Sequence, residues 1–149
     1  MSEVDTSVLS ARAAVRAAYG TNLDARVKEK IAYANFQDAF RDREAAYDIL
    51  RTAIINCHGA QVAFDALCVA ITNNDSDDIR VAYKTGHDAL VEAQVAYNEA
   101  YVAYKPIQAN FETVQSIFEE ATSTLQNTKL ALEEVCDALL CVEASSQTN

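Results

Sequence analysis

Apolar side chains in the second half of the chain recur at every seventh position. Nine large residues keep this spacing with no polar exception: Tyr83, Leu90, Tyr97, Tyr104, Phe111, Phe118, Leu125, Leu132 and Leu139. A companion column, mostly of small residues, consists of Ile79, Gly86, Ala93, Ala100, Ile107, Val114, Ala121, Thr128, Val135 and Val142. Two columns offset by three and four residues are typical of a helix that supercoils against a partner. The pattern predicts a long helix over residues 78–144.

The first half of the chain has a similar but wider apolar pattern. One stripe consists of Tyr33, Phe36, Phe40, Arg43, Tyr47, Leu50, Ile54, Cys57, Gln61, Phe64, Cys68 and Ile71. An adjacent stripe consists of Ala39, Ala46, Ile49, Ala53, Ala60, Ala63, Leu67 and Ala70. We therefore expect a helix over residues 23–72 that touches more than one neighbour, because two adjacent stripes make a face wider than a two-helix seam requires.

Two places interrupt these patterns. The stretch "TNNDSDD", residues 72–78, is rich in turn-forming residues, and Ser76 or Asp77 is suited to capping the following helix. It predicts a turn over residues 73–77 with its tip near Asp75. Gly20 suits a helix end, and Thr21 or Asn22 suits the next cap, so we expect a separate N-terminal helix over residues 4–19.

A hairpin with its tip at residue 75 places residue i of the first arm opposite residue 150 − i of the second. The charged pairs that this rule brings together are Arg12 with Ala138 beside Asp137, Arg16 with Glu134, Lys30 with Glu120 and Arg51 with Glu99. Arms of this length extend roughly 100 Å. Two helices alone bury too little of such wide apolar faces, so either the N-terminal helix folds back or copies of the chain associate.

Pro106 is the chain's only proline and stands inside the long second helix. The heptad phase passes from Ala100 and Tyr104 to Ile107 and Phe111 unchanged, which places Pro106 on the outer side of the helix. We predict a continuous helix kinked near this residue and no chain reversal.

Composition supports an all-α fold. Half of the 149 residues are hydrophobic, and three Gly and one Pro leave little turn chemistry. The predicted fold is a single domain, residues 1–149: a long antiparallel helical hairpin or coiled-coil-like bundle with an extra N-terminal helix. The net charge of −10 makes this an acidic protein and argues against nucleic-acid partners. The N-terminus lacks a signal-peptide pattern, so we expect a cytoplasmic location or an assembled particle.

The most apolar window, Ala53–Thr72, is long enough to span a bilayer. It contains Asn56, His58, Gln61 and Asp65, which are costly in hydrocarbon. A buried helix is therefore the favoured interpretation, and this composition argues against a membrane partner.

No motif for catalysis or ligand binding is present. The four cysteines, Cys57, Cys68, Cys136 and Cys141, lack CxxC spacing, and we expect free thiols; a disulfide or metal clip between the two pairs is the alternative. Neither His58 nor His87 follows a Glu at the spacing of a di-iron bundle. We expect no catalytic, cofactor-binding or metal-ligating residue, no cofactor and no enzymatic activity.

The seven tyrosines fall mostly on the stripes, where they fit a core better than a stacking platform for a ligand. A wide apolar face without chemistry predicts a structural subunit, such as a filament, virion or sheath component. Its expected partners are further copies of itself, in a homo-oligomer formed by self-assembly, or other helical proteins of an assembly. The alternative is a helical adaptor or chaperone that binds a partner helix. A membrane-active helical protein and an enzyme whose site forms between chains are further alternatives.

Overall fold

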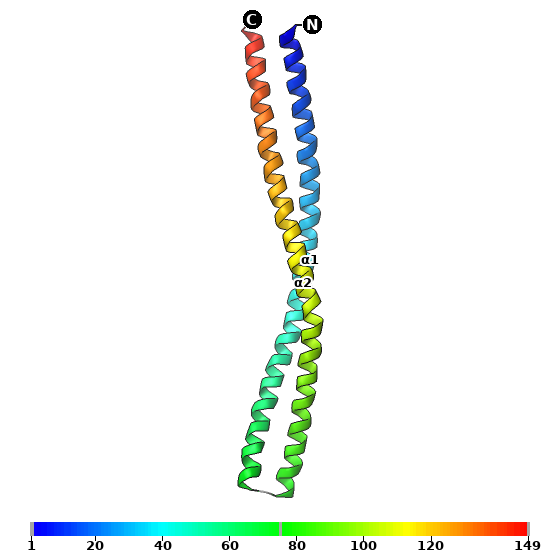
Figure 1. The fold of residues 1–149 in the computed structure, drawn as a ribbon, viewed down its shortest axis with the longest axis vertical. Coiled ribbons are helices and arrows are strands. Elements are labelled where there is room, and N and C mark those ends of the chain that lie inside the picture. The colour runs from blue at the N-terminus through cyan, green and yellow to red at the C-terminus, as the bar shows by residue number, and fades with distance from the viewer. Residues whose placement is uncertain (1, 75, 149) are drawn as a thin grey trace. The chain divides into compact units, whose positions relative to one another are not determined.

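The computed structural model describes residues 2–74 and 76–148 and contains two long helices that pack against each other (Figure 1). Helix α1 runs over Glu3–Asn73 and helix α2 over Asp77–Gln147. No strand occurs in the described ranges. The prediction of an all-α antiparallel hairpin is therefore confirmed. The predicted tip residue, Asp75, lies outside the described residues.

Helix α1 continues through the position where a break was expected. The separate N-terminal helix over residues 4–19 was wrong, because α1 is one helix from Glu3 onward and Gly20 has no positive φ. A glycine inside a helix costs only about 1 kcal/mol. Packing on both sides of Gly20 offsets that cost: Ala18 is half-buried, and Asn22 and Ala25 are buried.

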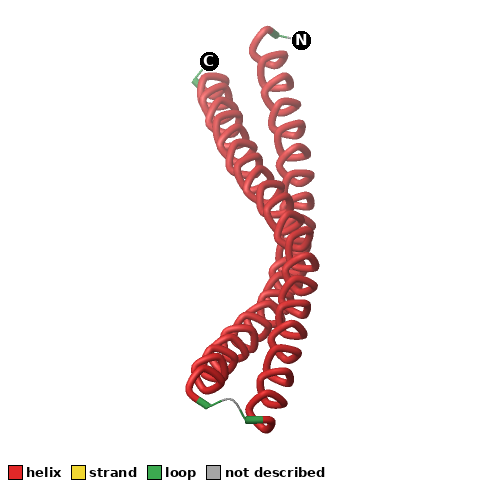
Figure 2. Tube along the Cα trace, turned by 60° about the horizontal axis from the view of Figure 1, so that its bottom comes forward, coloured by secondary structure: helices red, strands yellow, loops and turns green. Residues whose placement is uncertain are grey.

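Both helix starts are capped by a serine. The Asp5 backbone N–H donates to Ser2 Oγ (3.2 Å), and the Ser2 backbone N–H donates to the Asp5 carboxylate (3.3 Å). At α2 the Ile79 N–H donates to Ser76 Oγ (3.3 Å), with Asp77 in the first turn, where a negative charge suits the helix dipole. The predicted cap at Ser76 is confirmed. Figure 2 shows loop at the ends of the chain and beside the connection between the helices.

The chain divides into two compact units. The terminal unit combines residues 1–37 with residues 113–149, and the hairpin unit consists of residues 38–112. In each unit a segment of α1 packs antiparallel against a segment of α2. That the whole chain forms one domain stays a prediction.

The hairpin unit has a small core with an aromatic ladder beside it. Leu50, Ala53 and Ala100 are buried, and Tyr97 and Tyr104 pack against them. Aromatic rings from opposite helices meet at three levels along the unit. Their centroids are 6.3 Å apart for Phe40 with Phe111, 6.3 Å for Tyr47 with Tyr104 and 5.1 Å for Phe64 with Tyr83.

Arg43 packs over the ring pair of Phe40 and Phe111 in this ladder. Its guanidinium carbon lies 3.9 Å from the Phe111 ring centroid and 5.4 Å from that of Phe40, and its Nη2 is 3.4 Å from Glu44 Oε1. The aliphatic stem packs while the charge rests on the ring faces, so an arginine fits inside an apolar stripe.

The terminal unit has the same architecture with fewer rings. Ala25 and Ala32 are buried at the interface, each about 5% exposed. The Phe118 ring lies 5.5 Å from Tyr33 and 5.2 Å from Phe36, and it is stacked on the latter. Small residues on α1 thus leave room for larger ones on α2.

The period-seven seam of α2 is confirmed, since every one of its nine large residues is buried or half-buried. The centre of the α1 seam differs from the expectation. Ala32, Ala39 and Ala53 are 5–8% exposed, whereas Phe40 and Tyr47 are 43% and 46% exposed. Alanines such as Ala39 and Ala53 lie at the centre of the contact together with Leu50, and the large rings of Phe40 and Tyr47 flank it. Alanines let the backbones approach, and the larger α1 side chains then cover the edge of the α2 seam.

The predicted register is confirmed to within a few residues. Asn22 meets Thr128, the residue that the 150 − i rule assigns to it. The predicted partner of Arg12 was wrong: its Nη2 pairs with Glu143 Oε1 at 3.2 Å, because a long arginine side chain reaches along the neighbouring helix. Arg16, Lys30 and Arg51 form none of the ion pairs found among the described residues.

Helix α2 passes through Pro106 without interruption. Pro106 is exposed, and so is Val102, whose carbonyl loses its helical hydrogen bond there. The predicted continuous helix is confirmed, and the chain does not reverse at Lys105. A kink at this position stays a prediction.

Candidate interaction surfaces

The residue types that carry chemistry are dispersed along the helices. Within the described ranges, no three His, Cys, Asp or Glu side chains gather closely enough to hold a metal ion. All four cysteines are free thiols; Cys57 and Cys68 are half-buried in the hairpin unit. In the terminal unit Cys136 is half-buried and Cys141 is exposed.

The two histidines have different surroundings. The His87 ring lies edge-on to Phe64, with centroids 5.7 Å apart, and its Nδ1 is 3.9 Å from Asp88 Oδ1. His58 is exposed on the outer side of α1. His87 thus takes part in packing at the edge of the hairpin seam, while His58 faces away from it.

The tyrosines in the middle of α2, Tyr97, Tyr101 and Tyr104, are held by packing and hydrogen bonds. The Tyr104 hydroxyl donates to Gln108 Oε1 (2.9 Å), and Gln108 donates in turn to Glu112 (3.0 Å). Tyr101 stacks on Tyr97 with centroids 6.1 Å apart, and the Lys105 ammonium lies 5.0 Å from the Tyr101 ring. These rings contact other residues of α2, and Tyr104 also contacts Tyr47 of α1, as core and rim residues do.

A buried polar pair crosses the seam of the terminal unit. Asn22 is 1% exposed and donates through Nδ2 to Thr128 Oγ1 (3.1 Å), while Thr128 donates to the Leu125 carbonyl (3.0 Å). Asn22 Oδ1 is buried without a hydrogen-bond partner. The sequence interpretation of Asn22 as a helix cap was wrong. Two signals in the sequence could have placed Asn22 in the seam. It continues the period-seven column of Val8 and Val15, and the 150 − i rule sets it opposite Thr128.

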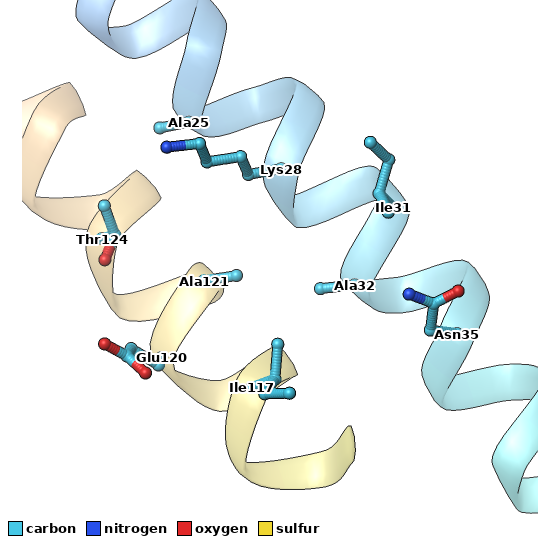
Figure 3. A pocket seen from close by; sticks show the side chains of 9 residues that line it. All are labelled: Ala25, Lys28, Ile31, Ala32, Asn35, Ile117, Glu120, Ala121 and Thr124. Carbon is cyan, nitrogen blue, oxygen red and sulfur yellow. The ribbon is translucent and has the colours of Figure 1, made fainter. Parts of the chain in front are cut away.

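Beside this seam an open groove of about 420 Å³ runs between the helices of the terminal unit. Ala25, Ala32 and Ala121 line its floor, and Figure 3 shows the last two pointing toward one another across it. Ile31 and Ile117 stand on its rims, 57% and 53% exposed. Its remaining lining residues are Lys28, Asn35, Glu120 and Thr124. We call this the terminal groove; its shape and lining suit apolar side chains from a helix.

A second apolar surface follows α1 in the hairpin unit, on the side turned away from α2. We call it the outer stripe; it consists of Ile55, Gly59, Val62, Ala66 and Val69, which are all exposed. Its three large residues are 55–62% exposed. Sequence reasoning missed this face, although these residues recur at intervals of four and three, as a second helix seam does.

The expectation that Ala53–Thr72 is a buried helix was wrong for the single chain. Of this window only Ala53 is buried, because α2 covers one side of α1 and leaves the other open. By length and composition alone, α1 also contains an 18-residue window that is apolar enough to cross a membrane, and no residue of that window is buried.

Comparison of the chain with protein-family models, with curated proteins and with solved structures found no match.

Proposed function

We propose that this chain is a non-enzymatic structural subunit that self-associates through its helical faces, as components of filaments, virions or sheaths do. The observation that carries the proposal is the excess of exposed over buried apolar side chains. In the described chain 21 large hydrophobic residues are at least 39% exposed, whereas 8 hydrophobic residues are buried, 5 of them alanine. Contiguous exposed apolar surface is typical of interaction sites.

The continuity of α1 supports this proposal. The sequence left two ways to cover the wide apolar face: a folded-back N-terminal helix or another copy of the chain. Because α1 runs unbroken over Glu3–Asn73, no separate N-terminal helix is available to fold back. Of these two ways, association with another copy of the chain is the one that the unbroken helix supports.

Light scattering coupled to size exclusion, with negative-stain imaging of the same fractions, tests the proposal. We expect assemblies larger than one 16.3 kDa chain at micromolar concentration. A folded chain that stays strictly monomeric up to the solubility limit would refute self-association.

The alternative function is a helical adaptor or chaperone, and the terminal groove is the observation that favours it. Ile31 and Ile117 flank an alanine floor, and this apolar lining suits one side of a further helix. This alternative expects a monomer or dimer with a single specific partner, whose binding is lost on Ile31→Lys. Retained partner binding in that variant would rule out the terminal groove as the site.

A further inference from the structure

The outer stripe is a continuous apolar face on one side of α1. Ile55, Val62 and Val69 are spaced at seven residues, and Gly59 and Ala66 lie between them. A methyl group added at Gly59 would meet nothing within 4 Å, so the chain itself leaves this position open. Because Gly59 and Ala66 have small side chains, the backbone of another helix can approach α1 closely at these two positions.

Two polar side chains border one flank of the stripe. His58 and Asp65 are seven residues apart and therefore lie on the same side of the helix, about 10.5 Å from each other along its axis. Asp65 Oδ1 accepts a hydrogen bond from Gln61 Nε2 (2.9 Å). The opposite flank carries Asn56 and Ala63 and no charged group between them.

This arrangement is complementary to itself only when two copies run antiparallel. In an antiparallel pair equivalent flanks face each other, and a two-fold axis near Val62 brings His58 of each copy to Asp65 of the other. The same axis sets Ile55 against Val69 and small residue against small residue. In a parallel pair the flank of His58 and Asp65 faces Asn56 and Ala63 instead, and neither His58 nor Asp65 meets the other.

A lipid surface fits the stripe less well. The apolar window also carries Asn56 and Gln61, and its other side contacts α2 through rings such as Phe64 on Tyr83. Insertion of α1 into hydrocarbon would expose those amides to lipid and separate the paired rings.

We infer that the outer stripe is the contact between two copies of this chain, packed antiparallel about a two-fold axis near Val62. The inference rests on the proposed function, since it names the face and the orientation through which self-association occurs. The stripe would then be an isologous interface, in which the same patch of each copy meets itself.

Val62→Glu is the decisive variant, with Val102→Glu as its matched control. Val102 is 68% exposed on α2 in the same unit, so both variants replace an exposed valine by the same charge. Val62→Glu places the carboxylates of the two copies against each other on the two-fold axis. We expect its dimer dissociation constant, measured by sedimentation equilibrium, to rise at least about 100-fold, because a charge is left unpaired in an apolar contact.

Charge exchange tests the orientation. His58→Asp places like charges opposite each other twice, and we expect weakening of roughly threefold to tenfold for two exposed pairs. Adding Asp65→Lys to that variant restores opposite charges only in the antiparallel arrangement, so the double variant should regain wild-type affinity. Circular dichroism melts establish that all variants remain folded.

The outcomes separate the inference from the proposed function. A strictly monomeric wild type overturns both. An oligomer that survives Val62→Glu, or that is lost equally in Val102→Glu, leaves self-association standing and overturns the outer stripe as its contact. A double charge variant that stays weak overturns the antiparallel orientation. A monomer that binds vesicles of anionic phospholipid, and loses that binding on Val62→Glu, assigns the stripe to a membrane instead.

Discussion

Replacing Asn22 by valine should stabilise the hairpin, although it removes a hydrogen bond between the helices. Asn22 is 1% exposed, and its amide makes one bond across the seam, to Thr128 Oγ1. Its carbonyl oxygen Oδ1 is buried without a partner. Valine matches Val8 and Val15 of the same α1 column and fills the site without a polar atom.

The magnitude follows from three contributions. The lost Asn22–Thr128 bond contributes about 1 kcal/mol, and an unsatisfied buried carbonyl costs about 1–3 kcal/mol. Burying a valine side chain adds up to about 1.5 kcal/mol. The Thr128 hydroxyl still donates to Leu125, so the replacement orphans no donor. The variant should gain about 1–3 kcal/mol, equivalent to a rise in Tm of about 3–10 °C for a chain of this size.

Thermal unfolding followed by circular dichroism at 222 nm measures this change, at a concentration below that of self-association. Asn56→Val is the matched control, because Asn56 is exposed on the same helix and its replacement should alter stability by less than about 0.5 kcal/mol. A Tm for Asn22→Val below that of the wild type would refute the reasoning, since the single cross-seam bond would then outweigh the unpaired carbonyl.

Three further changes probe other features. Gly20→Ala should stabilise α1 by about 1 kcal/mol, because nothing lies within 4 Å of the new methyl group. Gly86→Ala should increase stability by less, because its methyl group would displace the Leu67 side chain. Denaturant melts compare the two variants, and equal gains in stability would contradict the packing around Gly86. Pro106→Ala should raise stability by about 2–3 kcal/mol by restoring a helical hydrogen bond, and an unchanged melting curve would show that the helix already accommodates the ring. Arg12→Ala should lower the free energy of unfolding by less than about 1 kcal/mol, and high salt should abolish the difference from the wild type. A larger loss of stability that does not depend on salt would indicate that the aliphatic part of Arg12 packs against the helix.

Most of the hairpin could be predicted from the spacing of side chains. The α2 seam was readable because its large residues keep a period of seven at nine successive positions. A helix that packs against a single partner needs only one such seam. The turn was readable from the polar stretch around Ser76, and the position of that turn then determined the register that brings Asn22 to Thr128.

The errors share a physical cause, which is that local signals were weaker than packing. Gly20 resembles a helix end, but contacts on both sides keep it helical. Alanine and aromatic stripes are equally apolar in sequence, and only the approach of the backbones places Ala39 at the centre and Phe40 at the edge. The exposure of Val62 could not be read either, because the same pattern describes a helix covered on two sides.

The two helices are joined by a single short connection between Asn73 and Asp77. Its main thermodynamic effect is to hold each helix at a high effective concentration for the other, which a short tether typically sets in the millimolar range. If the connection were cut, the hairpin would become a heterodimer of two peptides, and their dissociation constant would report the strength of the alanine seam directly. Every other contact in the molecule would stay the same, so the difference between the intact and the cut chain isolates the contribution of chain connectivity to the fold.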